Sequence, residues 1–467
     1  MMLFLLACAM LIGGYFIYGT IVEKIIGINP ANKTPATTMT DGIDFVPLKP
    51  TKIFLIQFLN IAGLGPVFGA ILGALYGPVC LLWIVFGAIF AGAVHDILSG
   101  VISMRNGGAT MSAFVKKYLG NKFHNFFIVL MVFLLLLIGS IFAQTPAHML
   151  DNMTNLSFEM WLAIIFGYYF LATLLPIDKI IGRFYPFFGA CLIISTVLLM
   201  IVLFTKGTTF YPNLTTLNQN PSGKPIFPLM FITIACGALS GFHATQSPMM
   251  ARCITNEKYA RPIFYGAMIT EGFIALIWAT LGIAFYQGTS GLNDVLGASG
   301  DAGAVVSQIS KAFLGEWGGM LAVLSVIFLA ITTGDTALRS ARLSCADFLK
   351  SDQKKLGNRL FLSIFILALA TIMAFIDLGK IWVYFGWTNQ LLATIMLWVG
   401  AIYLHKQGKN DLIAVIPAIF ITSVCATYLG YAPILLNLPL EQAVYLGVFL
   451  TVMIIGLYLF MRRKIAA

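Results

Sequence analysis

Ionisable side chains are rare inside the long apolar stretches of this chain, and their types suit the binding or transfer of ions. Four of them stand well inside such stretches: His95, Asp96, Glu271 and Asp335. A charged side chain at the centre of a membrane helix costs about 2.5–3.5 kcal/mol on insertion scales. We therefore expect either a proton relay or inner gate, or a static network in which Arg339, one helical turn after Asp335, neutralises a carboxylate. For His95 and Asp96 we favour a role in holding helices together over proton transfer.

Hydroxyl groups surround one of these carboxylates. Thr332, Thr333 and Thr336 are close neighbours of Asp335 in the sequence. Hydroxyl and carboxylate oxygens are ligands that suit a hard cation such as Na⁺. We expect Thr332, Thr333 and Asp335 to form a sodium site, and the static salt bridge remains the alternative. The seven cysteines show no CxxC pair and no ligand spacing with histidine, so neither a zinc site nor any other cofactor is expected.

Two apolar segments, residues 61–66 (IAGLGP) and 234–248 (IACGALSGFHATQSP), hold too much glycine and proline for ordinary membrane helices. Irregular backbone at membrane depth is tolerated only where it is buried in protein or lines a cavity. Its freed N–H groups attract a carboxylate and its freed C=O groups a cation. Glycines that merely allow close helix packing are the alternative. We favour binding, because proline and polar side chains accompany both breaks: Asn60 directly precedes the first, and the second contains Ser240 and His243.

The positions expected to contact a solute lie in these two breaks and in one later apolar stretch. His243 stands apart from the other ionisable residues, in the second break, where an imidazole can change charge near physiological pH. Asn389 and Gln390 would complete a gate, or form a core amide network. The expected contact residues are Asn60, Ala62, Gly63, Gly65, Pro66, Gly237, Ser240, Gly241, His243, Asn389 and Gln390.

Composition indicates a polytopic membrane protein with a single membrane domain, residues 1–467. Hydrophobic residues make up 59% of the 467 residues, charged residues 10%, and the mean hydropathy is +0.92. Stretches of the roughly 20 residues that cross a bilayer recur from end to end. We predict 13 spans, near residues 2–22, 52–75, 78–103, 123–144, 160–175, 184–205, 226–247, 262–286, 317–335, 360–375, 381–404, 412–429 and 441–461.

Basic residues indicate the orientation of these spans. With 13 spans, 24 of the 28 Lys and Arg residues fall on one side, which predicts that this side is cytoplasmic. The amino terminus is then outside and the carboxyl terminus inside, in a bacterial-type cytoplasmic membrane. The first span lacks a basic segment before it, so we expect a retained helix and not a cleaved signal peptide. The net charge of +10 fits contact with anionic lipid, and no nucleic-acid partner is expected.

An inverted repeat emerges when the first helix, residues 1–28, is set aside. Each break opens a group of five spans, residues 52–205 and 226–404, and two helices follow at 411–461. Gly63 and Gly237 each lie 11 residues into their span, close to the membrane midplane at 1.5 Å per residue. Because five is odd, the second group enters from the opposite face. This predicts an all-α, five-plus-five inverted-repeat transporter fold, the LeuT-like fold of sodium-coupled amino-acid transporters.

Several segments together resemble the carbon starvation protein A (CstA) family. They are 41–47 (DGIDFVP), 61–66 (IAGLGP), 92–96 (GAVHD), 103–108 (SMRNGG), 232–243 (ITIACGALSGFH), 333–336 (TGDT) and 387–392 (WTNQLL). The resemblance covers about residues 29–404 and implies the amino-acid, polyamine and organocation superfamily. It also implies transport of peptides, or of pyruvate with protons, when preferred carbon runs out. Many members carry two adjacent histidines where this chain has Ile56 and Gln57, and this chain is shorter than the long members.

These observations predict a secondary active symporter that takes up small carboxylate-bearing solutes, peptides or pyruvate, by alternating access coupled to H⁺ or Na⁺. A membrane sensor that binds without transport is the main alternative. A channel is a weaker one, because nothing in the sequence repeats like a selectivity filter. No enzyme is expected, since neither HExxH nor a recognisable Ser/His/Asp constellation occurs.

Overall fold

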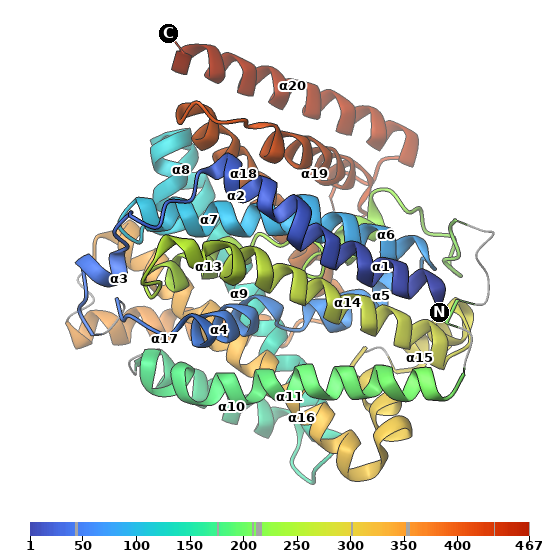
Figure 1. Ribbon diagram of the computed structural model, residues 1–467. Helices are drawn as coiled ribbons and strands as arrows, with labels where there is room; N and C mark the ends of the chain where they lie inside the picture. The colour runs from blue at the N-terminus through green and yellow to red at the C-terminus, as the bar shows by residue number, and fades with distance from the viewer. Residues whose placement is uncertain are drawn as a thin grey trace.

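The protein is a bundle of helices (Figure 1). The computed structural model describes residues 1–42, 45–174, 177–207, 210–211, 217–299, 302–351, 355–433 and 435–466, and no strand occurs in these ranges. Residues 43 and 44 of the segment 41–47 lie outside the described residues. So do the side chains of Lys179, Arg183 and Lys354, which contributed to the predicted orientation. The all-helical prediction is confirmed.

The elements follow one another in this order: α1 (Met2–Gly13), η1 (Gly14–Tyr18), α2 (Gly19–Ile26), α3 (Pro35–Thr38), α4 (Pro50–Ala62), η2 (Gly65–Gly69), α5 (Ala70–Ala74), α6 (Val79–Phe86), η3 (Gly87–Gly92), α7 (Ala93–Arg105), α8 (Met111–Leu119), α9 (Asn121–Asp151), α10 (Phe158–Leu174), α11 (Ile177–Thr205), α12 (Leu229–Thr233), α13 (His243–Ala251), η4 (Glu257–Tyr259), η5 (Arg261–Tyr265), α14 (Gly266–Phe285), α15 (Thr289–Ser299), α16 (Ala302–Leu349), α17 (Leu356–Met373), α18 (Leu378–Lys406), α19 (Leu412–Tyr431) and α20 (Leu440–Ala466).

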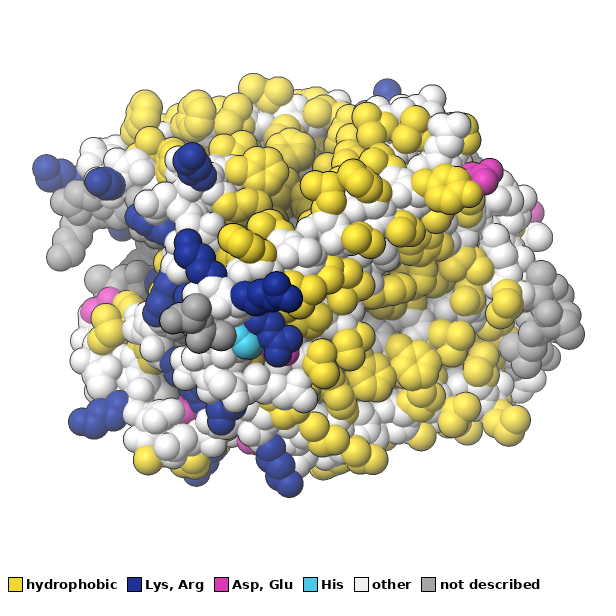
Figure 2. Space-filling view, turned by 90° about the horizontal axis from the view of Figure 1, so that it is seen from above, with side chains coloured by type: hydrophobic (Ala, Val, Ile, Leu, Met, Phe, Trp, Pro, Cys, Tyr) yellow, Lys and Arg dark blue, Asp and Glu magenta, His cyan; other side chains and the backbone are white. Residues whose placement is uncertain are grey.

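Each of the 13 stretches expected to cross the membrane contains helix. Within the described ranges, eight helices are long and apolar enough to cross a membrane unaided, and a ninth candidate is a bent pair. Three shorter apolar helices occupy the fifth, sixth and tenth expected stretches: Phe158–Thr173, Gly189–Thr205 and Gly357–Met373. The seventh stretch is divided between α12 and α13. Figure 2 shows one face of the molecule, on which hydrophobic side chains form a broad surface and most of the visible Lys and Arg side chains lie toward one end.

The first predicted break is present. Helix α4 ends at Ala62, and the chain resumes with η2 and α5 at an angle of 55°. Gly63 has φ 48° and ψ −149°, a conformation that glycine adopts far more easily than other residues. Pro66 lies at the start of η2, where its missing N–H removes no helical hydrogen bond. The two residues thus end one half-helix and begin the next.

The second break is longer. Helix α12 ends at Thr233, residues 234–242 form turns and irregular chain, and α13 begins at His243. Gly237 and Gly241 both lie in this segment, where a β-carbon on either would overlap a neighbouring helix. A β-carbon on Gly237 would lie 2.5 Å from Ala275 Cβ, so α14 fits directly against the irregular chain.

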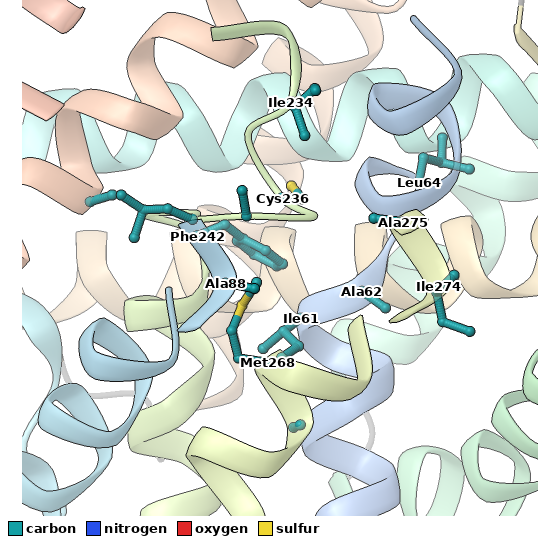
Figure 3. Close-up of a cluster of buried hydrophobic side chains, with 14 of the residues drawn as sticks. Ile61, Ala62, Leu64, Ala88, Ile234, Cys236, Phe242, Met268, Ile274 and Ala275 are labelled. Carbon is teal, nitrogen blue, oxygen red and sulfur yellow. The ribbon is translucent and has the colours of Figure 1, made fainter. Parts of the chain in front are cut away.

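The two broken helices pack against each other in antiparallel register. Gln57 Nε2 donates to Ser247 Oγ at 3.1 Å, and a β-carbon on Gly65 would overlap the Cys236 side chain. One turn further, a β-carbon on Gly69 would lie 3.1 Å from the Thr233 carbonyl oxygen. Residue numbers rise in one helix as they fall in the other, which is the arrangement that an inverted repeat predicts. Figure 3 shows Cys236 and Phe242 on the irregular segment, near the first break and Ala275.

An ion pair between buried Glu257 and the partly exposed Arg105 joins the ends of several spans, on the side predicted to be cytoplasmic. Arg105 Nε lies 2.5 Å from Glu257 Oε1, and the Glu257 side chain is 1% exposed. The same guanidinium donates to the carbonyl oxygens of Ile26 and Gly27 and to the hydroxyl of Tyr403. We call Arg105, Glu257 and Tyr403 the span-end hub. These contacts connect the end of α2 to the ends of α7 and α18 and to the start of the eighth span.

Candidate ion and solute site

Four ionisable side chains form one buried chain of contacts, which we call the His–Asp–His–Glu cluster: His95, Asp96, His243 and Glu271. His95 Nδ1 lies 2.8 Å from Asp96 Oδ1, and His243 Nδ1 lies 3.0 Å from Asp96 Oδ2. On its other side, His243 Nε2 lies 3.4 Å from Glu271 Oε2. All four side chains are fully buried.

Three separate elements position this cluster. His95 and Asp96 lie on the first turn of α7, Glu271 lies on α14, and His243 is the first residue of α13. The π-helical turn η3 immediately precedes α7, and such turns are frequent at functional sites. The sequence did not indicate that His243 would join the other three, because 147 residues separate it from Asp96.

The cluster is suited to exchanging protons. With both carboxylates ionised and both imidazoles neutral it would carry two negative charges in a fully buried place. Such charge is strongly disfavoured unless it is paired or neutralised. Protons bound by the imidazoles or by Glu271 provide that neutralisation, and His243 has one ring nitrogen beside each carboxylate. These contacts are those that a proton relay through His95, Asp96 and Glu271 requires, and they also hold helices together, so both roles stay predictions.

The freed backbone of the second break is largely satisfied by neighbouring helices. Asn389 Oδ1 accepts from the Phe242 N–H at 2.9 Å and from Ser240 Oγ at 3.1 Å. The Gly241 N–H donates to the main-chain oxygen of Asn389 at 3.1 Å. Gln390 Nε2 donates to the Phe231 carbonyl oxygen at 2.9 Å, just before the break. Both amides are thus brought to the second break, as a gate or a core amide network would require.

The first break carries an amide of a different kind. Asn60 is 1% exposed, and neither Nδ2 nor Oδ1 has a hydrogen-bond partner in the part of the chain that the structure describes. Ala62 and Pro66 are buried beside it, and the position of a β-carbon on Gly63 is filled by the Phe142 ring. Buried polar groups in proteins are nearly always hydrogen-bonded. A buried amide lacking such bonds is therefore a strong candidate to contact a ligand.

The threonines expected at a sodium site lie against the first break. Thr333 Oγ1 donates to the Leu59 carbonyl oxygen at 3.3 Å, one turn before Gly63. Thr332 Oγ1 donates to the Leu329 carbonyl oxygen of its own helix at 2.9 Å. Asp335 is 1% exposed on α16, and the guanidinium of Arg339 donates to the Ala172 carbonyl oxygen. The structure therefore brings Thr333 to the break, and the sodium site remains a prediction.

Some contacts that shape the site were not predicted from the sequence. Trp83 Nε1 donates to the freed carbonyl oxygen of Ile234 at 3.0 Å. Gln57 was noted only as a departure from a family pattern, yet it joins α4 to α13 through Ser247. An indole N–H and an amide inside apolar stretches each need a buried partner. That requirement is the signal by which these residues can be found.

In sequence and in fold, this chain is similar to proteins described as transporters. A family model described as "Carbon starvation protein CstA" matches residues 1–152, 141–310 and 297–428. An uncharacterized membrane protein of Haemophilus influenzae Rd is 46% identical over 351 residues, 64% of this chain and 95% of that protein. The peptide transporter CstA of Bacillus subtilis 168 is 27% identical over 524 residues, 89% of this chain and 88% of that protein. The pyruvate/proton symporter BtsT of Escherichia coli K12 is 28% identical over 326 residues, 55% of this chain and 45% of that protein.

Solved structures with little sequence similarity share the fold. The structure of MhsT in complex with L-phenylalanine superposes with a TM-score of 0.58 at 12% identity over 87% of this chain and 99% of that one. A manganese transporter of Eremococcus coleocola gives 0.55 at 12% identity over 92% of this chain and 98% of that one. The predicted LeuT-like fold is confirmed. Since the family model extends from residue 1 to residue 428 and agrees with this fold, the chain belongs to the carbon starvation protein CstA family.

Proposed function

We propose that the protein is a symporter that takes up a small carboxylate-bearing solute, pyruvate or a short peptide, together with protons. The observation that carries this proposal is the position of His243. It is the first residue of the half-helix that follows the second break, and it also belongs to the His–Asp–His–Glu cluster. The residue that would sense a proton therefore adjoins the backbone that would bind an anion.

Electrostatics supplies the coupling in this proposal. A proton taken up by the cluster makes the start of α13 more positive, and this favours a carboxylate at the N–H groups of the preceding segment. By linkage, a bound carboxylate raises the affinity of the cluster for the proton to the same extent. Loading of both species would then favour the closing and reorientation of the two broken helices, which contact each other at Gly65 and Cys236.

The relatives support the solute class but leave the choice of solute to experiment. The names of two relatives include a peptide transporter and a pyruvate/proton symporter, both of which handle carboxylates. We propose the same class here, together with use during carbon starvation and residence in a bacterial cytoplasmic membrane with the amino terminus outside. Sodium coupling through Thr332, Thr333 and Asp335 is a second candidate, favoured by the contact of Thr333 with the first break.

The deciding experiment is uptake into proteoliposomes that contain the purified full chain. Labelled pyruvate, alanine and a dipeptide would be offered under an imposed proton gradient, an imposed sodium gradient, or neither. We expect one carboxylate solute to accumulate above its external concentration when the proton gradient points inward, and protein-free liposomes serve as the control. Saturable binding without any flux would instead identify a sensor, and unsaturable rapid flux would identify a channel.

A further inference from the structure

Donors of the second break converge on one side chain from another helix. Asn389 Oδ1 accepts from the Phe242 N–H and from the Ser240 hydroxyl, while its main-chain oxygen accepts from the Gly241 N–H. Its Nδ2 makes a long contact of 3.6 Å with Cys236 Sγ. Asn389 is fully buried, and so is Ser240. The break thus directs three donors toward oxygen atoms of a single residue.

These donors would suit a carboxylate better than they suit an amide. A carboxylate oxygen accepts hydrogen bonds in the same directions as an amide oxygen, but charge assistance makes those bonds roughly twice as strong. The donors also lie at the start of α13, a nine-residue helix whose positive end favours anions. The neutral amide of Asn389 holds the backbone in place, but it carries no negative charge that could interact with the positive start of α13.

A second observation places an unpartnered amide opposite the same donors. Gln57 faces Ser247, and Gly65 faces Cys236, so the antiparallel register sets Asn60 opposite the junction between the break and α13. The Asn60 amide is buried and has neither a donor nor an acceptor partner among the described residues. It can both donate to and accept from a polar group next to a bound carboxylate.

We infer that Asn389 is an internal substitute for the solute carboxylate. In the structure described here its oxygens occupy the donors of Ser240, Gly241 and Phe242. A solute carboxylate would displace the Asn389 side chain from Ser240 and Phe242, and Asn60 would bind the polar group next to that carboxylate. This inference rests on the proposed function, because it assumes a carboxylate-bearing solute. It adds that a side chain of α18 competes with the solute for the same donors.

Equilibrium binding of labelled pyruvate to the purified full chain tests the inference with two variants of the same residue. Asn389→Ala removes the competitor, so pyruvate should bind about two- to tenfold more tightly, in line with the strength of a neutral hydrogen bond. Asn389→Asp keeps an acceptor and introduces a fixed negative charge, so pyruvate should bind at least about tenfold more weakly. Gln144→Ala is the matched control, because this buried amide donates to the carbonyl oxygen of Ile376 and not to an atom of the second break.

Thermal unfolding provides a readout that distinguishes competition from a structural role. Asn389→Ala should unfold at a lower temperature than the unaltered protein without pyruvate, and pyruvate should stabilise it more strongly. Weaker pyruvate binding by Asn389→Ala, or unchanged binding by both variants, overturns the inference while leaving the proposed function in place. If the unaltered protein binds none of pyruvate, alanine and a dipeptide, the proposed function fails, and the inference fails with it. Asn389→Asp keeps the test valid if Asn389→Ala does not fold.

Discussion

The imidazole of His243 lies between two carboxylates, with Nδ1 3.0 Å from Asp96 Oδ2 and Nε2 3.4 Å from Glu271 Oε2. Asp96 comes from α7, and Glu271 comes from α14. A proton that arrives on one side of the ring can leave from the other, since both ring nitrogens exchange protons. One residue therefore links two helices of opposite repeats to the start of a broken helix.

Glu271→Gln tests whether this link couples transport to protons. The amide keeps the size of the side chain but cannot ionise, so the cluster loses one exchangeable proton. We expect proton-driven accumulation of the solute in proteoliposomes to fall at least about tenfold, while exchange of labelled for unlabelled solute continues. His124→Gln is the control, since His124 lies outside the cluster at the start of α9. Accumulation at the level of the unaltered protein would mean that Glu271 has a structural role only.

Gly65→Ala tests the close contact of the two breaks. A β-carbon at Gly65 would overlap the Cys236 side chain, and overpacking of this kind typically costs about 1–3 kcal/mol. We expect the variant to insert into the membrane, to lose uptake and to unfold at a lower temperature. Gly167→Ala is the matched control, because a β-carbon there meets no atom within 4 Å. Adding Cys236→Gly to Gly65→Ala should restore part of the uptake, and a double variant no better than Gly65→Ala alone would contradict the contact.

Local sequence was sufficient to predict the two breaks but not their partners. Glycine at Gly63 and proline at Pro66 act on the backbone of their own segment, so their effect is visible in sequence. The equal depth of the two breaks also comes from counting residues along the sequence, and it stays a prediction. The thirteen apolar stretches likewise depend on local composition.

Pairings between distant residues depend on packing that no local pattern specifies. The contacts of His243 with Asp96, and of Glu257 with Arg105, join residues 147 and 152 positions apart. Each residue was visible as an ionisable group, but its partner was set by the register of whole helices. Asn389 shows the same limit, because its amide was predicted to form a gate or a core amide network while its bonds to the second break were not predicted.

Glu257→Gln tests the hub that joins the span ends. Glu257 is almost fully buried but its partner Arg105 is 21% exposed, so loss of the Glu257 carboxylate should cost less than the roughly 3–5 kcal/mol of a fully buried ion pair and more than an exposed pair. Glu23 pairs with Arg261 at 3.1 Å, but both side chains are about a quarter exposed, so Glu23→Gln should cost about 0–1 kcal/mol. Thermal unfolding in detergent should therefore show a clearly larger fall for Glu257→Gln. If the two variants lower the unfolding temperature equally, the contact between Glu257 and Arg105 does not contribute specially to stability.

Asp335→Asn and Thr333→Val together distinguish a sodium site from a proton site or a static network. Thr333 donates to the Leu59 carbonyl oxygen beside the first break, and valine keeps its shape while removing the hydroxyl oxygen. If Na⁺ binds here, both variants should raise the sodium concentration needed for half-maximal uptake, since each removes an oxygen ligand. Thr371→Val on α17 is the control, because its hydroxyl donates only within its own helix.

A change in the pH dependence of uptake in Asp335→Asn alone would assign Asp335 to protons. Unchanged ion dependence in both variants would instead identify Asp335 as part of a static network, and the His–Asp–His–Glu cluster would then be the one coupling site proposed.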